Sequence, residues 1–262
     1  TLANLQLRLP VVVIGGGLTA VDTCTEALAY YPVQVEKFLA RHELLVAERG
    51  EHAVRVHWSE EDHGIADEFI AHAQAIRAER RAAAMEGRPP RILDLLHSWG
   101  GATLVYRRRL IDSPAYRNHE EIAKAMEEGI RFAENLSPVA VEVDDFGSVS
   151  GIQLKDKDGQ PHRLPARAIV VAAGTVPNTN LARERSDITL DGKFFQAVDE
   201  DGRPVTPERL AKPGIAQVLM HVDGHDRTVS FFGDLHPSYA GNVVSAMASA
   251  KQGHPVVTRA MA

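Results

Sequence analysis

The stretch VVVIGGGLTAVD, residues 11–22, decides the fold. Its four leading apolar residues run without interruption, which is typical of a strand buried on both faces of a parallel sheet. Gly15, Gly17 and Ala20 then fill a G-x-G-x-x-A pattern that opens an amphipathic helical segment. The first glycine allows a tight turn, the second lets backbone approach a pyrophosphate, and the third small residue lets helix pack on strand. The stretch therefore predicts a dinucleotide site at the glycine loop, Gly15, Gly16 and Gly17, together with Ala20.

The residue that ends the second strand distinguishes the nicotinamide dinucleotides. An acid there receives the ribose 2′-OH of NAD, whereas arginine accommodates the 2′-phosphate of NADP. In one interpretation VQVEKF is that strand and Glu36 is the acid. In the other, residues 33–98 are an insertion, ATLVYRRR (102–109) holds the strand, and Arg107 and Arg108 receive the phosphate. We prefer the second interpretation, because VEKFLARHELLVAER continues at helical period and ATLVY is the better buried strand.

The rest of the chain predicts alternating helices and strands. A helix is expected from Leu18 to about Tyr30, with a break or bend at Pro32. Further helices are expected in GIADEFIAHAQAIRAERRAAAMEG, RILDLLHSWGG, NHEEIAKAMEEGI with Asn118 as N-cap, and GNVVSAMASAKQG. Strands are expected in IRFAENL, AIVVAAG and TVSFFGD, and an antiparallel meander over residues 139–166. We predict an α/β fold: a Rossmann-like three-layer parallel sheet with an antiparallel meander and a helical insertion.

Composition bounds the classes of function. The 262 residues are 44% hydrophobic and 24% charged, with a net charge of −6, which is the profile of a globular protein. There is no basic segment interleaved with aromatic residues to favour nucleic-acid binding, and no apolar run approaches the ~20 residues of a membrane span. The single cysteine, Cys24, cannot form an internal disulfide or a CxxC pair, so we expect a reducing, cytoplasmic location.

Each motif also has a plainer interpretation. The glycines could form a turn that serves only packing, and Arg107 to Arg109 could be a solvated run of charges. Cys24 falls inside the first expected helix, where a small packing residue is the simpler interpretation. The histidines between His42 and His72 lie in a charged segment without metal-ligand spacing, which predicts a solvated surface rather than a metal site.

Two later stretches are also informative. IVVAAGTVPN (169–178) is a strand that ends in Ala-Gly, which lets backbone approach a cofactor. FFGDLHPSYAGNVVSAM (231–247) is a strand that ends in Gly-Asp and precedes a glycine-started helix. Such an arrangement places a carboxylate on a polyol and helix N–H groups on an electron-rich ring.

The order of these motifs resembles the NADPH domain and C-terminal flavin segment of pyridine nucleotide–disulfide oxidoreductase-type flavoproteins, above all the glutamate synthase small-subunit branch. The resemblance implies hydride transfer from NAD(P)H to FAD, with electrons passing on to iron–sulfur clusters. It implies that Gly15, Gly17, Leu18, Thr19 and Ala20 hold the pyrophosphate of the nicotinamide dinucleotide. It places the other cofactor contacts at Arg107, Arg108, Ala173, Gly174, Gly233, Asp234, Gly241, Asn242 and Val243. The family often has Asn at the position of Leu18.

The resemblance also carries expectations about domains and partners. Residues 1–175 would be the NAD(P)H-binding domain with the 33–98 insertion, and residues 176–262 the C-terminal part of an FAD-binding domain. Such flavoproteins begin with a separate FAD-binding strand and helix, and only ten residues precede VVVIGGG. We therefore expect an excised piece whose partners are the missing half of the FAD domain and an iron–sulfur domain or subunit. Alone it would bind a nicotinamide dinucleotide weakly, bind FAD poorly and lack turnover.

We assign no catalytic residue, because hydride transfer between nicotinamide and flavin is the cofactors' own chemistry. The single cysteine argues against a dithiol relay within the chain. Two alternatives remain open: a regulatory or scaffolding domain that kept the fold and lost the cofactor, and a stand-alone Rossmann dehydrogenase. The second would need an acid near the nicotinamide, and no Tyr-x-x-x-Lys occurs.

Overall fold

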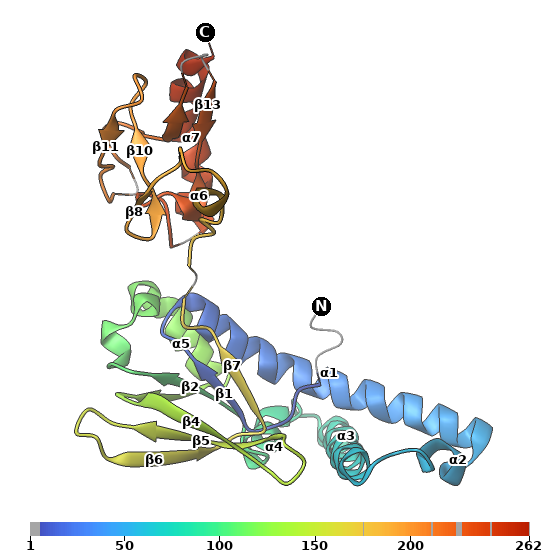
Figure 1. Ribbon diagram of the computed structural model, residues 1–262. Coiled ribbons are helices and arrows are strands. Elements are labelled where there is room, and N and C mark those ends of the chain that lie inside the picture. Colours follow the sequence, from blue (N-terminus) through green and yellow to red (C-terminus); the bar gives the residue numbers. More distant parts are fainter. Residues whose placement is uncertain (1–5, 175, 211, 224–226, 242, 262) are drawn as a thin grey trace. The chain divides into compact units, whose positions relative to one another are not determined.

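A computed structural model describes the chain except residues 1–5, 175, 211, 224–226, 242 and 262, and the side chains of residues 117–119 are also left undescribed. The chain divides into two compact units, Thr1–Gly174 and Thr175–Ala262, coloured blue to yellow and yellow to red in Figure 1. Each unit is described by itself below.

The centre of the first unit is a parallel sheet of four strands in the order β3-β2-β1-β7. Val11 of β1 pairs with Ala102 of β2 and with Ala168 of β7. Both flanking segments therefore come from far along the sequence, and ATLVY is the second strand, as we preferred. The strands are β1 (Val11–Ile14), β2 (Ala102–Tyr106), β3 (Arg131–Glu134) and β7 (Ala168–Val171).

Helices cover one face of this sheet and an antiparallel meander covers the other (Figure 1). Val11 and Val13 of β1 pack toward the helices, whereas Val12 packs toward the meander. This explains why the VVVI run has no polar member: both of its faces are buried. The predicted three-layer α/β fold is confirmed. The covering elements are α1 (Leu18–Arg49), α4 (Ile92–Ser98), α5 (His119–Glu127), β4 (Ser137–Val143), β5 (Val149–Lys155) and β6 (Pro161–Pro165).

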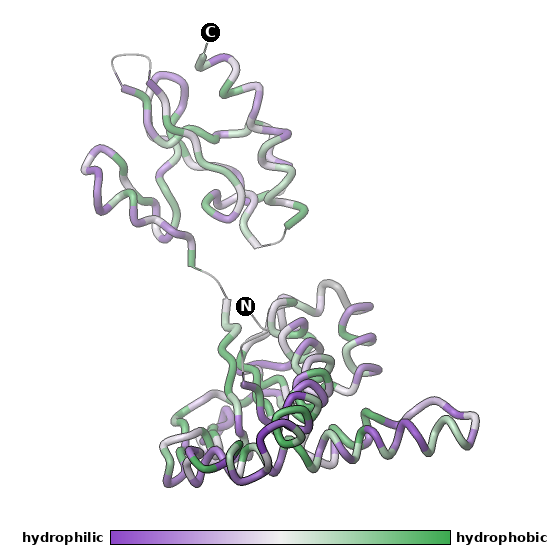
Figure 2. Tube along the Cα trace, turned by 90° about the vertical axis from the view of Figure 1, so that its right-hand side faces the viewer, coloured by the Kyte–Doolittle hydropathy of each residue, from purple (hydrophilic) through white to green (hydrophobic). Residues whose placement is uncertain are grey.

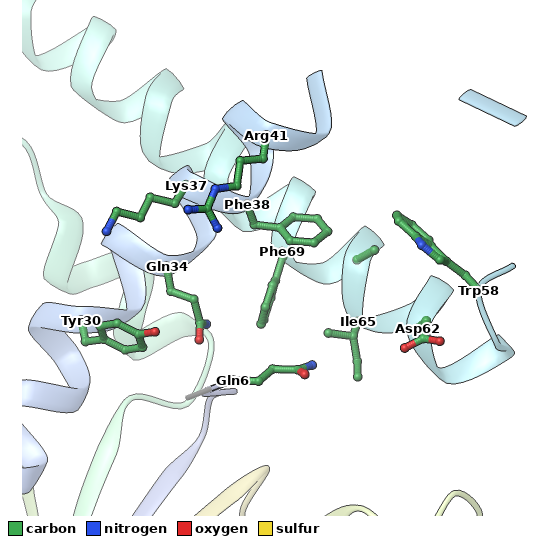
Figure 3. A pocket seen from close by; sticks show the side chains of 11 residues that line it. Gln6, Tyr30, Gln34, Lys37, Phe38, Arg41, Trp58, Asp62, Ile65 and Phe69 are labelled. Carbon is green, nitrogen blue, oxygen red and sulfur yellow. The ribbon is translucent and has the colours of Figure 1, made fainter. Parts of the chain in front are cut away.

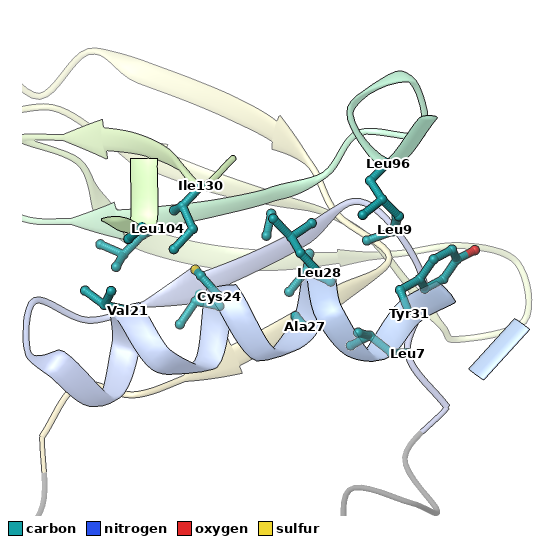
Figure 4. Close-up of a cluster of buried hydrophobic side chains, with 14 of the residues drawn as sticks. Leu7, Leu9, Val21, Cys24, Ala27, Leu28, Tyr31, Leu96, Leu104 and Ile130 are labelled. Atoms are coloured by element: carbon teal, nitrogen blue, oxygen red, sulfur yellow. The ribbon is translucent and has the colours of Figure 1, made fainter. Parts of the chain in front are cut away.

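The first half of α1 lies along the sheet through small and medium side chains, shown in Figure 4. Ala20 and Cys24 are completely buried, and Leu28 and Tyr31 complete the same face. Because the side chains of this face are small, the axis of α1 lies close to the strands. The glycine loop therefore packs against β2 and β7.

The expected break at Pro32 is wrong, because α1 continues without interruption through Pro32 to Arg49. Proline removes one helical hydrogen bond, a cost of roughly 3 kcal/mol in an isolated helix. Here Tyr31, Pro32 and Val35 are all buried, and packing of this apolar face offsets the loss. Glu36 consequently lies inside a helix and not in a strand.

Beyond the sheet, α1 forms a helical arm with α2 (Glu51–Arg55) and α3 (Glu60–Glu86), and this arm is the predicted insertion. A capping box at Ser59 and Asp62 begins α3, and Gly87 in the left-handed region ends it. Hydrophilic and hydrophobic residues alternate along these helices (Figure 2). The expected N-cap at Asn118 lies among the side chains that are not described.

The second unit contains a four-stranded antiparallel sheet, a two-stranded hairpin and a C-terminal helix. The strand expected in TVSFFGD is shorter than predicted, because Gly233–Leu235 forms a turn of 3-10 helix, and the last helix runs past its predicted end at Gly253 to Ala260. Its elements are α6 (Leu181–Glu184), β8 (Leu190–Asp191), β9 (Phe194–Phe195), β10 (Ala197–Val198), β11 (Pro204–Val205), β12 (Leu219–Val222), β13 (Thr228–Ser230) and α7 (Val243–Ala260). Among the described residues, no helix is both long and apolar enough to cross a bilayer.

Candidate functional site

The glycine loop closes one edge of the parallel sheet, and its first glycine has no room for a side chain. The Gly15 N–H donates to the carbonyl of Val105 at 3.1 Å. A Cβ at Gly15 would lie 2.2 Å from the carbonyl oxygen of Ala172 and 2.8 Å from the Cβ of Ala20. The G-x-G-x-x-A pattern therefore reflects a close contact in the structure, because Gly15 and Ala20 must both be small for α1 to pack against the strands.

The second glycine of the pattern lies in open space instead. Gly17 is the N-cap of α1, no side chain caps the helix there, and a Cβ at Gly17 would meet nothing within 4 Å. The first-turn N–H groups of Leu18 and Thr19 have no acceptor one turn earlier in the helix. Uncapped N–H groups and the positive end of the helix dipole favour an anion at this position.

Gly16 is covered by the ring of Tyr106, the last residue of the second strand. A Cβ at Gly16 would lie 2.2 Å from the ring of Tyr106, and the Gly16 carbonyl accepts a hydrogen bond from the N–H of Ala115 at 3.0 Å. Tyr106 ends β2, so the second strand supplies one wall of the loop. The only signal in the sequence was an aromatic residue directly before the three arginines.

Arg107 and Arg108 leave the same sheet edge as the glycine loop. Ile14 pairs with Val105 in register, so the residues that follow β1 and β2 emerge side by side. Both arginines are exposed, and neither side chain has a hydrogen bond or ion pair with the described part of the chain. Such groups are free to bind a phosphate.

The third arginine of the run behaves differently. Arg109 forms an ion pair with Asp112 at 2.9 Å. The hydrogen bond from Arg109 is the main reason that the pKa of the Asp112 carboxyl lies below its ordinary value, and the charge of Arg108 contributes less.

Ala173 and Gly174 follow β7 on the other side of the glycine loop. Ile14 pairs with Val171, and the N–H of Ala172 donates to the carbonyl of Ile14 at 2.8 Å. The strand order reverses between β1 and β7, since β2 and β3 follow β1 on one side and β7 lies on the other. In open α/β sheets, ligands bind outside the carboxyl ends of the strands at such a reversal.

Glu36, the alternative residue for the ribose, is distant from this edge. It forms an ion pair with Arg80 of α3 at 2.6 Å. The helical rise places it roughly 28 Å along α1 from Gly17. The interpretation of Glu36 as the NAD-specific acid is therefore wrong, because the acid belongs to the helical arm.

The predicted residues of the second unit gather at the start of α7. Asp234 accepts a hydrogen bond from the N–H of Gly241 at 3.0 Å, and the N–H of Gly233 donates to Ser249 at 2.9 Å. Val243 begins α7 and is exposed. Asn242 lies outside the described residues. The structure thus brings Asp234 and Gly241 together, seven positions apart in sequence.

Cys24 is a packing residue. It is completely buried in the helix face that meets the sheet, and burial raises the pKa of its thiol to about 12. Within the described ranges, no three His, Cys, Asp or Glu side chains are grouped in a way that could hold a metal ion.

No protein-family model matches the sequence. An uncharacterized protein of Rickettsia prowazekii (strain Madrid E) is 31% identical over 260 residues, which cover 98% of this chain and 31% of that protein. The NADPH glutamate synthase small chain of Escherichia coli (strain K12) is 29% identical over 122 residues, or 40% of this chain and 24% of that one. The putative oxidoreductase AegA of the same organism is 31% identical over 127 residues, or 42% and 19%.

The solved structure of Thermoplasma acidophilum thioredoxin reductase superposes with a TM-score of 0.50 at 12% identity, covering 96% of this chain and 53% of that one. The chain thus has a Rossmann-like fold of the kind seen in that thioredoxin reductase. Part of its sequence is similar to a glutamate synthase small chain and to a putative oxidoreductase. It spans about a third or less of the length of the curated relatives that it matches. The expectation of an excised piece stays a prediction.

Proposed function

We propose that the first unit binds NADPH at the edge of its parallel sheet. Gly15, Gly16, Gly17, Leu18, Thr19 and Ala20 hold the pyrophosphate, and Arg107 and Arg108 hold the 2′-phosphate. Ala173 and Gly174 lie beside the nicotinamide half. The carrying observation is a pair of exposed arginines that leave the sheet next to a helix N-terminus without a side-chain cap and have no partner in the described part of the chain.

The residues of this edge fit a dinucleotide. The open space at Gly17 lets backbone come within contact of a pyrophosphate, and the N–H groups of Leu18 and Thr19 point out of the helix toward it. Two guanidinium groups supply charge and a forked geometry for a phosphate monoester. Orientation of the nicotinamide is the contribution of the protein, since hydride transfer is the cofactor's chemistry.

We further propose that the chain acts within an FAD-dependent NAD(P)H oxidoreductase that passes electrons to an iron–sulfur or other partner. Asp234 and Gly241 at the start of α7 would contact FAD, with Gly233, Asn242 and Val243 around them. The hydrogen bond between Asp234 and Gly241 supports this role, because it presents the carboxylate beside the exposed first turn of α7. The sequence relationship to a glutamate synthase small chain and to a putative oxidoreductase supports the class.

Titration with NADPH and with NADH, followed by thermal unfolding, tests the nucleotide site. A ligand that binds only the folded chain raises the unfolding temperature as its concentration passes the dissociation constant. We expect a larger shift with NADPH, and we expect Arg107→Gln combined with Arg108→Gln to remove the preference over NADH. Arg109→Gln is the matched control, because Asp112 already occupies Arg109.

Two results would overturn the proposal. Equal shifts with both nucleotides, unchanged in the double variant, would remove the arginines from the site. No shift with either nucleotide would favour a regulatory domain that kept the fold without the cofactor. The visible spectrum of the isolated chain tests the FAD expectation separately, since a yellow protein as purified would contradict poor FAD binding by this chain.

A further inference from the structure

The helical arm contains a pocket that the nucleotide site does not use. The pocket has a volume of about 450 Å³ and lies between the middle of α1 and the beginning of α3. Lys37, Phe38 and Arg41 come from α1, and Trp58, Asp62 and Phe69 face them from the segment around the start of α3 (Figure 3). Pockets of this size accommodate small organic molecules.

The walls of this pocket are aromatic. The rings of Phe38 and Phe69 meet edge to face with their centroids 5.7 Å apart. Trp58 lines the same pocket and is only half-buried, and the guanidinium of Arg55 lies over its ring at 5.1 Å. Aromatic surfaces of this kind favour another planar ring, through stacked or edge-on contact.

Two positive charges at the pocket have no partner among the described residues. Lys37 and Arg41 are four positions apart and so lie on one face of α1. Both are exposed, and neither makes a hydrogen bond or ion pair with the described residues. The neighbouring acids of α1 are already used, because Glu36 pairs with Arg80 at 2.6 Å and Glu43 pairs with Arg77 at 2.7 Å.

The acid at the pocket does not neutralise these charges. Asp62 accepts hydrogen bonds from the N–H of Ser59 at 3.0 Å and from its hydroxyl at 2.8 Å. These two bonds, the one from the backbone first, hold the pKa of Asp62 below its ordinary value. Asp62 thus serves as a helix cap, and the pocket presents beside its apolar wall two cations that no described residue pairs with.

The pocket is separate from the glycine loop. Phe38 lies twenty residues after Leu18 in the same helix, which corresponds to about 30 Å along its axis. A dinucleotide at the sheet edge would therefore leave the pocket empty.

We propose that this pocket binds a small aromatic carboxylate, with its ring between Phe38, Phe69 and Trp58 and its carboxylate at Lys37 and Arg41. The two cations supply the charge-assisted contacts, and the aromatic wall excludes ligands that are anionic but not planar. This inference is independent of the proposed nucleotide function.

Calorimetric titration of the full chain with 2-naphthoate tests the proposal, with the neutral 2-naphthamide as the matched ligand. We expect 2-naphthoate to bind, and we expect the amide to bind at least about tenfold more weakly, since it lacks the charge. Lys37→Gln combined with Arg41→Gln should raise the dissociation constant for 2-naphthoate by about tenfold or more. Arg49→Gln combined with Lys124→Gln removes the same charge away from the pocket and should leave binding unchanged.

Two outcomes would overturn the proposal. The first is no binding of 2-naphthoate to the full chain while its thermal unfolding remains normal. The second is equal binding of naphthoate and naphthamide, or equal loss in both double variants, which would indicate general hydrophobic or charge effects.

Discussion

The two halves of helix α1 stabilise the first unit through different kinds of contact. The first half meets the sheet through the buried apolar side chains of Ala20, Cys24 and Leu28. The second half packs against α3 through Leu39 and its apolar neighbours. Two ion pairs flank this contact, Glu36 with Arg80 and Glu43 with Arg77. A helix on a sheet needs small side chains at its closest approach, whereas two helices can be joined by long ones. The same helix therefore tolerates substitution unequally along its length.

Gly15→Ala, in the loop directly before the first half of α1, should have the largest effect of all. Its Cβ would lie 2.2 Å from a backbone oxygen, and β7 would have to separate from β1 to make room, at a cost of about 3 kcal/mol or more in unfolding free energy. Urea unfolding measures this loss.

Gly17→Ala is the matched control, because its Cβ would enter open space and φ is −96°. We expect it to unfold like the native chain and to bind NADPH less tightly. A Gly15→Ala variant of native stability would contradict the described contact between loop and β7.

Leu39→Ala should have the largest effect in the second half. Leu39 is 2% exposed and belongs to the same apolar cluster as Leu28, so we expect a loss of about 3 kcal/mol. Both tryptophans, Trp58 and Trp99, lie in or directly after the insertion, and their fluorescence reports its unfolding. Because the cluster is continuous along α1, arm and sheet should unfold in one transition. Two separate transitions in the native chain would show that the arm is an independent unit.

Cys24 gives a smaller, pH-dependent effect. Burial raises the pKa of its thiol from 9.0 to about 12, so the folded chain disfavours the thiolate. The contribution of the buried, protonated thiol to the free energy of unfolding is complete below pH 9.0 and is lost as the pH rises toward about 12. Alkylation with iodoacetamide at mildly alkaline pH should be slow in the folded chain and fast in urea. Equally fast reaction in both states would show that the first half of α1 opens readily.

Glu36→Gln should have the smallest effect. Ion pairs near the surface contribute about 0 to 1 kcal/mol, and the Arg80 partner is half exposed. Thermal unfolding should shift little, and the affinities for NADPH and NADH should stay unchanged. A selective loss of NADH affinity would indicate that Glu36 does contribute to the nucleotide site.

Local patterns predicted most elements of the fold. Hydrophobic periodicity in the sequence revealed the apolar run at Val11–Ile14, the helices of the insertion and the strands of the meander. The choice of ATLVY as the second strand was right. Pro32 misled the prediction, because the sequence shows the lost hydrogen bond and not the burial of Tyr31 and Val35 that offsets it. The Gly15–Ala172 contact and the Tyr106 wall could not be predicted, since both join residues from different strands.

The sequence by itself determined the turn that a dinucleotide would need, the positions of the glycines and the presence of three arginines. Only the tertiary structure distinguishes those arginines, because it pairs Arg109 with Asp112 and gives Arg107 and Arg108 no partner among the residues it describes. It also places Glu36 beside Arg80, away from the site, and places Lys37 and Arg41 at the wall of an aromatic pocket. The physical reason is that period and propensity are local properties, whereas the partner of a charge is decided by which distant segments pack beside it.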